Sequence, residues 1–526
     1  MSKINKYDAI IIGGGHNGLT AAAYLSKAGK KVLVLEKRYI LGGAAVTEEI
    51  FPGFKFSVCS YVVSLLKSNI IRELQLPKFG LELLPLESTF TPLDGDYLLR
   101  TSDCDETYRQ ISRHSPKDAE AYMRFGPLMG QVGMSVRPIL ETIAPNPQKP
   151  SFYDLLSIKK LFKHFNSLDS KQFEYLCKLM TMSSADFLDE WFEYEPLKAT
   201  MAASGIIGTF MGPKSPGSAY VMLHHYMGEI DGAFRAWGFQ RGGTGEVSMA
   251  IARAAEYYGA TIKTEIAVKQ VIVKNKKAVG VYLENGDEYQ ADTIISSLDP
   301  KLTFLKLIDR KDLPDDFIKD IKNFCIRGSS GKVNLALDSL PNFTSLPGDG
   351  PHLSGAISIS PNYNYLEKAF DDAKYGNFSQ KPYMDIILPS VLDPDMAPPG
   401  KHVMSCFVQY APYNIKGGWD EHKKLAFGDA VIDTISEYAP NIKDIILDRQ
   451  ILTPKDLEET FSLTQGNIFH GELTLQQLFS LRPAAKWADY KTPIKNYFQC
   501  GSGTHPGGGI TGSPGEMAAK KILGKQ

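Results

Sequence analysis

A glycine motif near the N-terminus constrains this chain more than any other feature. The apolar run 9–12 predicts a buried strand, and Gly13, Gly15 and Gly18 follow it with the spacing of a G-x-G-x-x-G turn. A helix pattern comes next, and residues 31–35, apolar from Val32 on, predict a second strand. The order strand, glycine turn, helix, strand predicts a Rossmann-like unit at the start of the chain.

Each glycine of this turn has a separate physical task. Gly13 allows the tight turn, Gly15 lets the backbone approach a pyrophosphate, and Gly18 lets the helix pack closely on the strand. The N-terminus of the helix offers free N–H groups and the positive end of its dipole to phosphates. Glu36 ends the second strand, where a carboxylate accepts ribose hydroxyls and repels a 2′-phosphate. The motif therefore predicts a dinucleotide with an unphosphorylated ribose.

Composition excludes several other classes of protein. The chain has 526 residues, is 43% hydrophobic and 22% charged, and carries a net charge of −1. This balance gives no basic field for nucleic acid, so we expect no nucleic-acid partner. There is no run of about 18 apolar residues and no leader before the first strand, so we expect a cytoplasmic protein. The six cysteines form no C-x-x-C motif, which argues against a redox dithiol or a zinc site.

The rest of the chain contains one long helix-rich segment and several glycine-rich ones. The helix pattern covers 106–197, and a glycine-rich stretch at 231–245 leads into a helix over 246–258. Strand patterns over 267–296, with an Asn-Gly turn, predict a β-meander. No second G-x-G-x-x-G lies between a strand and a helix, so we expect a single dinucleotide.

Further motifs carry a resemblance to a known family, and together they run nearly end to end. They are Gly42-Gly43, Trp191-Phe192-Glu193, His224-His225, Arg241-Gly242-Gly243-Thr244-Gly245, Gly466-Asn467-Ile468-Phe469-His470, Arg482-Pro483 and Gly501-Ser502-Gly503-Thr504-His505-Pro506-Gly507-Gly508-Gly509. With the N-terminal unit, they resemble the FAD-dependent oxidoreductases of the bacterial-type phytoene desaturase group. The chain is also similar to the carotenoid ketolases of the same superfamily.

The resemblance implies an α/β fold with two domains. A Rossmann-like FAD-binding domain of the glutathione-reductase/amine-oxidase type would carry an inserted α+β substrate domain. We expect the FAD-binding domain to combine residues 1–95, 235–300 and 480–526, and the substrate domain to combine 96–234 with 301–479. A homo-oligomer is compatible with this arrangement.

The resemblance also assigns cofactor contacts to residues of this chain. Glycines of the first turn would hold the pyrophosphate, Glu36 the ribose, and the backbone of Val268 the adenine. Gly43 and Ala44 would follow the ribityl chain, and the start of the last helix would face the flavin pyrimidine. The full expected set is Gly13, Gly15, Gly18, Glu36, Gly43, Ala44, Val268, Gly503, Thr504, Gly508 and Ile510.

The substrate implied by the resemblance is a long apolar isoprenoid, which FAD would oxidise by hydride abstraction. Electrons would pass to oxygen or a quinone. The chain departs from the desaturase pattern at 56–61, where Phe-Ser-Val-Cys-Ser-Tyr replaces a Phe-Asp-x-Gly-Pro-Thr segment beside the flavin. Phytoene itself is therefore not the expected substrate.

Candidates for catalysis are His505 in the terminal loop, His224 before the glycine-rich stretch, and Arg241 at its end. Either histidine could act as acid or base, or simply orient its neighbours, and Arg241 could hold a carbonyl or form a surface ion pair. Their spacing indicates no metal site, so none is expected. Weaker candidates are His225, Glu229, Asp231 and His470.

The segment 152–165 alternates large apolar residues with Lys159, Lys160, Lys163 and His164. A helix of this kind can lie on an anionic membrane surface, which would make the protein peripherally membrane-associated. The same pattern also fits a domain helix with a solvated basic face.

Two other functions are compatible with the residues, and a third is disfavoured. An amine oxidase of the same fold would need an aromatic cage at the flavin, and the chain is rich in Tyr and Phe. A flavin-bound scaffold or regulatory interaction protein would need little catalysis. A nicotinamide-dependent reductase is disfavoured by the single nucleotide unit.

Overall fold

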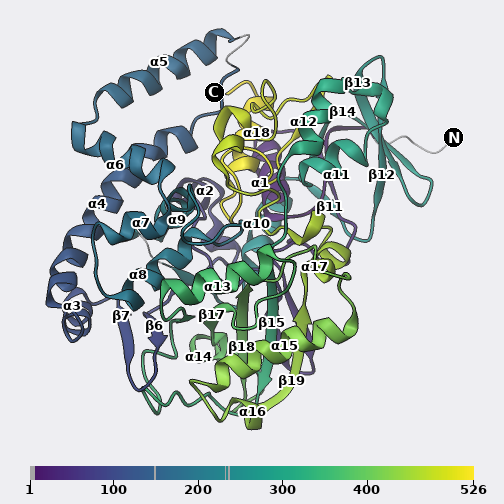
Figure 1. Cartoon of the computed structure of the whole chain (residues 1–526). Helices are drawn as coiled ribbons and strands as arrows, with labels where there is room; N and C mark the ends of the chain where they lie inside the picture. The colour runs from purple at the N-terminus through teal and green to yellow at the C-terminus, as the bar shows by residue number, and fades with distance from the viewer. Residues whose placement is uncertain (1–5, 147–149, 231–232, 235–236, 526) are drawn as a thin grey trace.

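The computed structural model describes residues 6–146, 150–230, 233–234 and 237–525. Two large sheets and a layer of helices make up most of this part of the chain (Figure 1). In the view of Figure 1, most helices of residues 104–226 lie along one side, and the second sheet lies below the strands of residues 261–296, which belong to the first sheet.

The first sheet contains the N-terminal unit. Its strands are β1 (Lys6–Ile12), β2 (Val32–Leu35), β11 (Thr261–Lys263), β12 (Val268–Lys274), β13 (Lys277–Leu283), β14 (Glu288–Ser296) and β20 (Tyr497–Gln499). Strands β11, β2, β1, β14 and β20 are parallel, while β13 and β12 extend the sheet as an antiparallel meander. This sheet therefore joins the two ends of the chain with its middle.

Helices cover both faces of the first sheet, which explains why its central strands are apolar throughout. One face packs against α1 (His16–Lys27), α10 (Gly245–Tyr257) and α18 (Ser513–Ile522). The other face packs against α11 (Pro300–Leu305) and α12 (Asp315–Asn323). Ile10 and Ile11 are both fully buried, although their side chains point to opposite faces. The result is the Rossmann-like α/β fold expected from the glycine motif.

The second sheet is mostly antiparallel, in the order β19-β15-β18-β17-β16-β6-β7. Its strands are β6 (Ser88–Pro92), β7 (Tyr97–Thr101), β15 (Ser330–Leu337), β16 (Ala356–Ile359), β17 (Tyr383–Ile387), β18 (His402–Gln409) and β19 (Ile446–Leu452). Since β6 starts at Ser88, this sheet draws on residues before the expected boundary at 95. The domain limits themselves stay a prediction.

The two faces of the second sheet have different neighbours. One face packs against α15 (Glu421–Ser436). The other supports a helical layer whose core includes Phe125, Phe187 and Phe407. That layer contains α3 (Cys104–Ser112), α4 (Pro116–Leu140), α5 (Phe152–Asn166), α6 (Ser170–Thr181), α7 (Ser184–Asp189), α8 (Glu195–Ala202), α9 (Ser218–Tyr226) and α13 (Tyr363–Lys374).

Shorter elements complete the chain. They are β3 (Thr47–Phe51), β4 (Phe54–Ser57), α2 (Ser68–Leu74), β5 (Leu83–Pro85), β8 (Glu229–Ile230), β9 (Ala233–Phe234), β10 (Gly238–Gln240), α14 (Pro389–Leu392), α16 (Ile442–Ile445) and α17 (Pro454–Phe461). In the described part of the chain, no helix is both long and apolar enough to cross a bilayer.

A buried carboxylate fixes the start of α4 to the rest of the helical layer. The Asp118 side chain is fully buried and accepts hydrogen bonds from the backbone N–H of Glu193 at 3.0 Å and of Tyr194 at 2.8 Å. These N–H groups belong to the turn before α8, so one side chain satisfies two donors in a buried place.

We predict that Asp118→Ala lowers the free energy of unfolding by about 2–3 kcal/mol, because both N–H groups lose their acceptor. Glu120→Ala, at an exposed position of the same helix, should change it by less than about 0.5 kcal/mol. Urea unfolding followed by circular dichroism measures both. Equal midpoints for the two variants would contradict this role of Asp118.

Candidate functional site

The glycine turn has the geometry that a pyrophosphate site requires. Gly13 has a φ of 94°, a conformation that other residues rarely adopt. A Cβ on Gly18 would lie 2.4 Å from the Gly13 carbonyl oxygen, so only glycine lets α1 pack this closely. Beyond its neighbours in the chain, no described residue has an atom within 4 Å of the place where Gly15 would carry a Cβ, so its backbone is open on that side.

Glu36 lies beside this turn at the end of β2. Its buried carboxylate accepts the N–H of Gly14 at 2.7 Å and of Arg38 at 2.8 Å. The Glu36 carbonyl accepts the N–H of Ile266 at 2.8 Å. This hydrogen bond brings the start of β12, at Val268, close to Glu36. The expected ribose and adenine contacts therefore gather at one end of the turn.

The terminal glycine-rich loop meets the same turn from the other end of the chain. Asn17 donates from Nδ2 to the Ser502 hydroxyl at 3.0 Å, across 485 residues of sequence. The N–H of Gly42 donates to the Gly14 carbonyl at 2.9 Å, which brings Gly43 and Ala44 to the same place. Gly503 and Thr504 follow Ser502 directly.

Two buried polar atoms at this junction fit a bound cofactor. Within the described residues, His16 Nε2 and Asn17 Oδ1 are buried without a hydrogen-bond partner. Both belong to the first turn of α1, where the phosphates of a dinucleotide would lie. The residues present therefore fit FAD, and the glycines, Glu36 and the terminal loop are the groups that would hold it.

Arg482 fastens the terminal loop to the segment before it. The Arg482 side chain is fully buried, and its guanidinium donates to six backbone carbonyls. These are the carbonyls of Phe469, Gly471, Glu472, Gln477, Ser502 and Thr504. Burial lowers the pKa of Arg482 to about 10, so the group stays a cation at neutral pH.

Four histidines are buried around this loop and are neutral. Burial is the main cause, and it lowers the pKa of His16, His470 and His505 to about 4 and that of His224 to about 3. His470 adds to the lowering of the His16 pKa, and the Arg482 cation adds to that of His224, His470 and His505. Hydrogen bonds link His224 Nε2 to the Gly508 carbonyl at 3.3 Å and His505 Nε2 to the Ile139 carbonyl at 3.0 Å. Among the described residues, no group of His, Cys, Asp or Glu could hold a metal ion.

The three catalytic candidates occupy different environments. His505 joins the loop to α4 and also contacts the Phe479 ring, which is the geometry of an orienting residue. Arg241 is about half exposed and pairs with Glu82 at 2.9 Å, so the geometry favours a surface ion pair. His224 lines a pocket next to the terminal loop. The catalytic roles of all three, like the individual FAD contacts, stay predictions.

The weaker candidates for catalysis also lie in different surroundings. His470 lies next to His16, and His225 packs between Trp237 and Phe469 with its Nδ1 on the Val221 carbonyl. Asp231 lies outside the described residues, and the structure describes only the backbone of Glu229.

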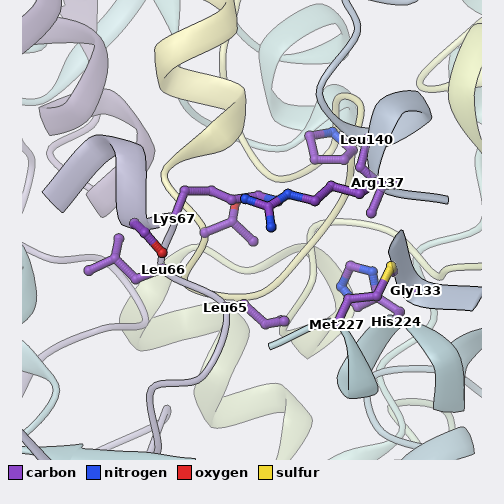
Figure 2. A pocket seen from close by; sticks show the side chains of 11 residues that line it. Leu65, Leu66, Lys67, Gly133, Arg137, Leu140, His224 and Met227 are labelled. Atoms are coloured by element: carbon purple, nitrogen blue, oxygen red, sulfur yellow. The ribbon is translucent and has the colours of Figure 1, made fainter. Parts of the chain in front are cut away.

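The pocket beside His224 lies between the terminal loop and α4 (Figure 2). It has an empty volume of about 600 Å³, its open mouth included. Apolar side chains provide much of the wall, and Lys67 and Arg137 provide positive charge, both near Glu141. His224 Nδ1 is buried there without a partner in the described chain. The apolar residues are Leu65, Leu66, Leu140, Met227 and Pro506.

Sequence reasoning missed a second cluster, centred on Lys332 in β15. The Lys332 side chain is buried, no described group hydrogen-bonds to its Nζ, and Nζ lies 4.5 Å from the centre of the Tyr61 ring. Tyr61 stacks on Phe407 with ring centres 5.7 Å apart and donates its hydroxyl proton to Asp385 at 2.7 Å. The sequence contained one signal for this cluster, which was a lysine inside a strand that is otherwise suited to burial.

The cluster titrates in the neutral range. Burial lowers the pKa of Lys332 to about 8, and burial raises the pKa of Asp385 to about 6. It adjoins the cofactor residues, because the N–H of Ser60 donates to the Ala44 carbonyl at 3.1 Å. Segment 56–61, where the chain departs from the desaturase pattern, therefore connects Ala44 with Tyr61 and Lys332.

Comparison with known proteins identifies the family of this chain. Residues 18–515 match the family of flavin containing amine oxidoreductases. The chain belongs to this family. It is thus a flavin-dependent oxidoreductase, and its cofactor is FAD.

Relatives and solved structures agree with this assignment. The chain is 42% identical to pyridine nucleotide-disulfide oxidoreductase domain-containing protein 2 of Rattus norvegicus, covering 98% of this chain and 93% of the relative. It is 26% identical to a limonene dehydrogenase component of Castellaniella defragrans, covering 99% and 95%. It is also 26% identical to the chloroplastic prolycopene isomerase 1 of an Oncidium hybrid cultivar, covering 86% and 74%.

Solved structures with this fold include a triple mutant of putrescine oxidase, with a TM-score of 0.62, 15% identity and 99% of both chains covered. Cyclohexylamine oxidase from Brevibacterium oxydans has a TM-score of 0.58 at 18% identity, with 99% and 98% covered. These structures confirm the fold expected from the sequence. The family match and the sequence relatives confirm the expected superfamily.

We predict that Glu36→Gln weakens FAD binding by about tenfold to a hundredfold, because a neutral amide replaces a charge-assisted acceptor for the ribose. The variant keeps the size of the side chain and one acceptor for the Gly14 N–H. Titration of the apoprotein with FAD, followed by flavin fluorescence, measures the dissociation constant. Glu256→Gln, an exposed position of α10, is the matched control, and equal constants for the two variants would refute the ribose contact.

Proposed function

We propose that the protein dehydrogenates an apolar, isoprenoid- or carotenoid-like substrate and passes the electrons to oxygen or a quinone. FAD supplies the hydride acceptor for such a reaction. The names of two relatives, limonene dehydrogenase and prolycopene isomerase, both refer to isoprenoid hydrocarbons, which supports this substrate class.

The observation that carries the proposal is the position of Lys332. A buried aromatic pair attracts cations to its faces, and Lys332 Nζ already occupies that position over Tyr61. An ammonium substrate would meet a buried, like-charged group there whenever Lys332 is protonated. A neutral apolar molecule meets no such repulsion.

Lys332 also suits the proton half of a dehydrogenation. A hydride and a proton leave neighbouring carbons, the C–H electron pair left by the proton forms the new double bond, and a base must take the proton. Among the described residues Lys332 Nζ has no hydrogen-bond partner, and its pKa of about 8 means that its neutral form is populated at slightly alkaline pH. Asp385, bonded to the hydroxyl of Tyr61, holds that ring in place.

An amine oxidase is the second candidate. The family name, and the stacked pair of Tyr61 and Phe407 with an interplanar angle of 20°, favour it as the start of an aromatic cage. A third candidate, a flavin-bound scaffold with little catalysis, requires that no donor reduce the flavin.

We predict that an isoprenoid hydrocarbon bleaches the flavin in anaerobic stopped-flow mixing, and that the rate rises with pH through about 8. The rise follows because Lys332 must lose its proton before it can accept another. Lys332→Met should lower the rate by about a hundredfold or more and flatten the pH profile. Lys306→Met, at an exposed lysine, should leave both unchanged.

The same assay separates the alternatives. Bleaching by amines with release of hydrogen peroxide, and none by hydrocarbons, would establish the amine oxidase instead. Rapid bleaching by NADH or NADPH would establish the nicotinamide-dependent reductase. A flavin that no donor reduces would leave the flavin-bound scaffold as the remaining candidate function.

A further inference from the structure

Helix α5 exposes large apolar side chains to solvent. Phe152 is 71% exposed, Phe162 is 67% exposed and Leu155 is 54% exposed, whereas soluble surfaces seldom gather such residues. The exposed apolar set continues onto α6 through Phe173. In full it contains Phe152, Tyr153, Leu155, Leu156, Ile158, Phe162 and Phe173; we call it the α5 patch.

The inner face of α5 already packs against the rest of the protein. The α5 patch is therefore a separate, outward face of the helix and not the face that belongs in the core. Leu161 is buried, and Phe165 packs against the core of the helical layer. His164 Nε2 lies 2.9 Å from the Ser135 carbonyl of α4. Asp154 and Ser151 form a capping box at the start of the helix. The outward residues therefore serve no packing within the described part of this chain.

The charge on the outward face has one sign. Lys159, Lys160 and Lys163 are exposed, and within the described residues none of them forms an ion pair. The acidic residue of the helix, Asp154, is only 7% exposed and is used in the cap. Leu155, Ile158 and Phe162 follow helical spacing and form an exposed apolar stripe beside these lysines.

We propose that the α5 patch docks the protein on the surface of an anionic phospholipid bilayer, with α5 lying in the plane of the interface. Apolar side chains would enter the acyl boundary, while the lysine ammonium groups reach the headgroup phosphates. A protein–protein interface is the poorer fit, since interface centres are depleted of lysine and no exposed acid of α5 accompanies these three. Each lysine adds electrostatic attraction to an anionic leaflet.

The position of the patch relates it to the pocket. In Figure 1, α5 lies at the edge of the molecule, beyond α4 and α6. The same helix α4 supports α5 through Ser135 and lines the pocket of Figure 2 through Gly133 and Arg137. Docking would bring the pocket near the hydrocarbon interior of the bilayer, in which apolar molecules dissolve. This last step rests on the proposed function, whereas docking itself does not.

Flotation of the FAD-loaded full chain with vesicles tests the proposal. We expect binding to vesicles of equal parts phosphatidylcholine and phosphatidylserine, weak binding to phosphatidylcholine alone, and loss of binding at high salt. Reversing three charges in K159E/K160E/K163E should weaken binding by about a hundredfold or more. Phe152→Ser with Phe162→Ser should weaken it on anionic vesicles as well.

The matched control is Tyr257→Ser with Tyr375→Ser, two exposed aromatic residues outside the patch, which should bind as the unchanged protein does. Equal flotation of all variants, or no flotation of the unchanged protein, would overturn the proposal. A dimer that the α5 substitutions dissociate, without vesicle binding, would assign the patch to a second copy of the chain. Flavin reduction by a detergent-dispersed substrate, measured on the same variants, reports on the proposed function separately.

Discussion

The structure depends on one buried cation, the guanidinium of Arg482. Its charge is withdrawn from water, and backbone carbonyls from two separate segments replace the lost hydration. In the described part of the chain no carboxylate forms an ion pair with it, so the positive charge is not neutralised locally. A lysine could not reach as many acceptors, because only the planar guanidinium presents its donors in a fixed fork.

Two consequences follow for the site. The terminal loop is held against residues 469–477, which places Ser502 on Asn17 and the glycine turn. The uncompensated charge also helps, with burial, to keep His224, His470 and His505 neutral. A fixed cation that no carboxylate neutralises favours negative charge that develops nearby, as arises on a flavin that gains electrons.

Sequence patterns predicted the parts of this structure that are built locally. The glycine turn, the strands of the N-terminal unit and the meander with its Asn-Gly turn each occupy a few consecutive residues, and the structure confirms their fold. The family and FAD were predicted from the same motifs and are confirmed as well. The role of Arg241 at the substrate stays a prediction. Its side chain pairs with Glu82 at 2.9 Å and lies 3.8 Å from the buried carboxylate of Asp393, which also accepts the backbone N–H of Gly242.

The parts that could not be predicted are assembled over long distances. Tyr61 and Asp385 are 324 residues apart in sequence, and no local pattern indicates that they share a hydrogen bond. Lys332 looks like an ordinary lysine of an edge strand until both neighbours of β15 are known. Arg482 was noted as part of a motif, yet its role follows only from carbonyls that converge in the folded chain.

The most direct test of this account is the FAD affinity of Arg482→Lys, measured by titrating apoprotein that matches the unchanged chain in circular dichroism. The account predicts a dissociation constant at least about tenfold higher, since each lost hydrogen bond to a charged group is worth about 1.5–3 kcal/mol. Unchanged affinity together with unchanged thermal stability would contradict it, because the terminal loop would then hold its place without the guanidinium.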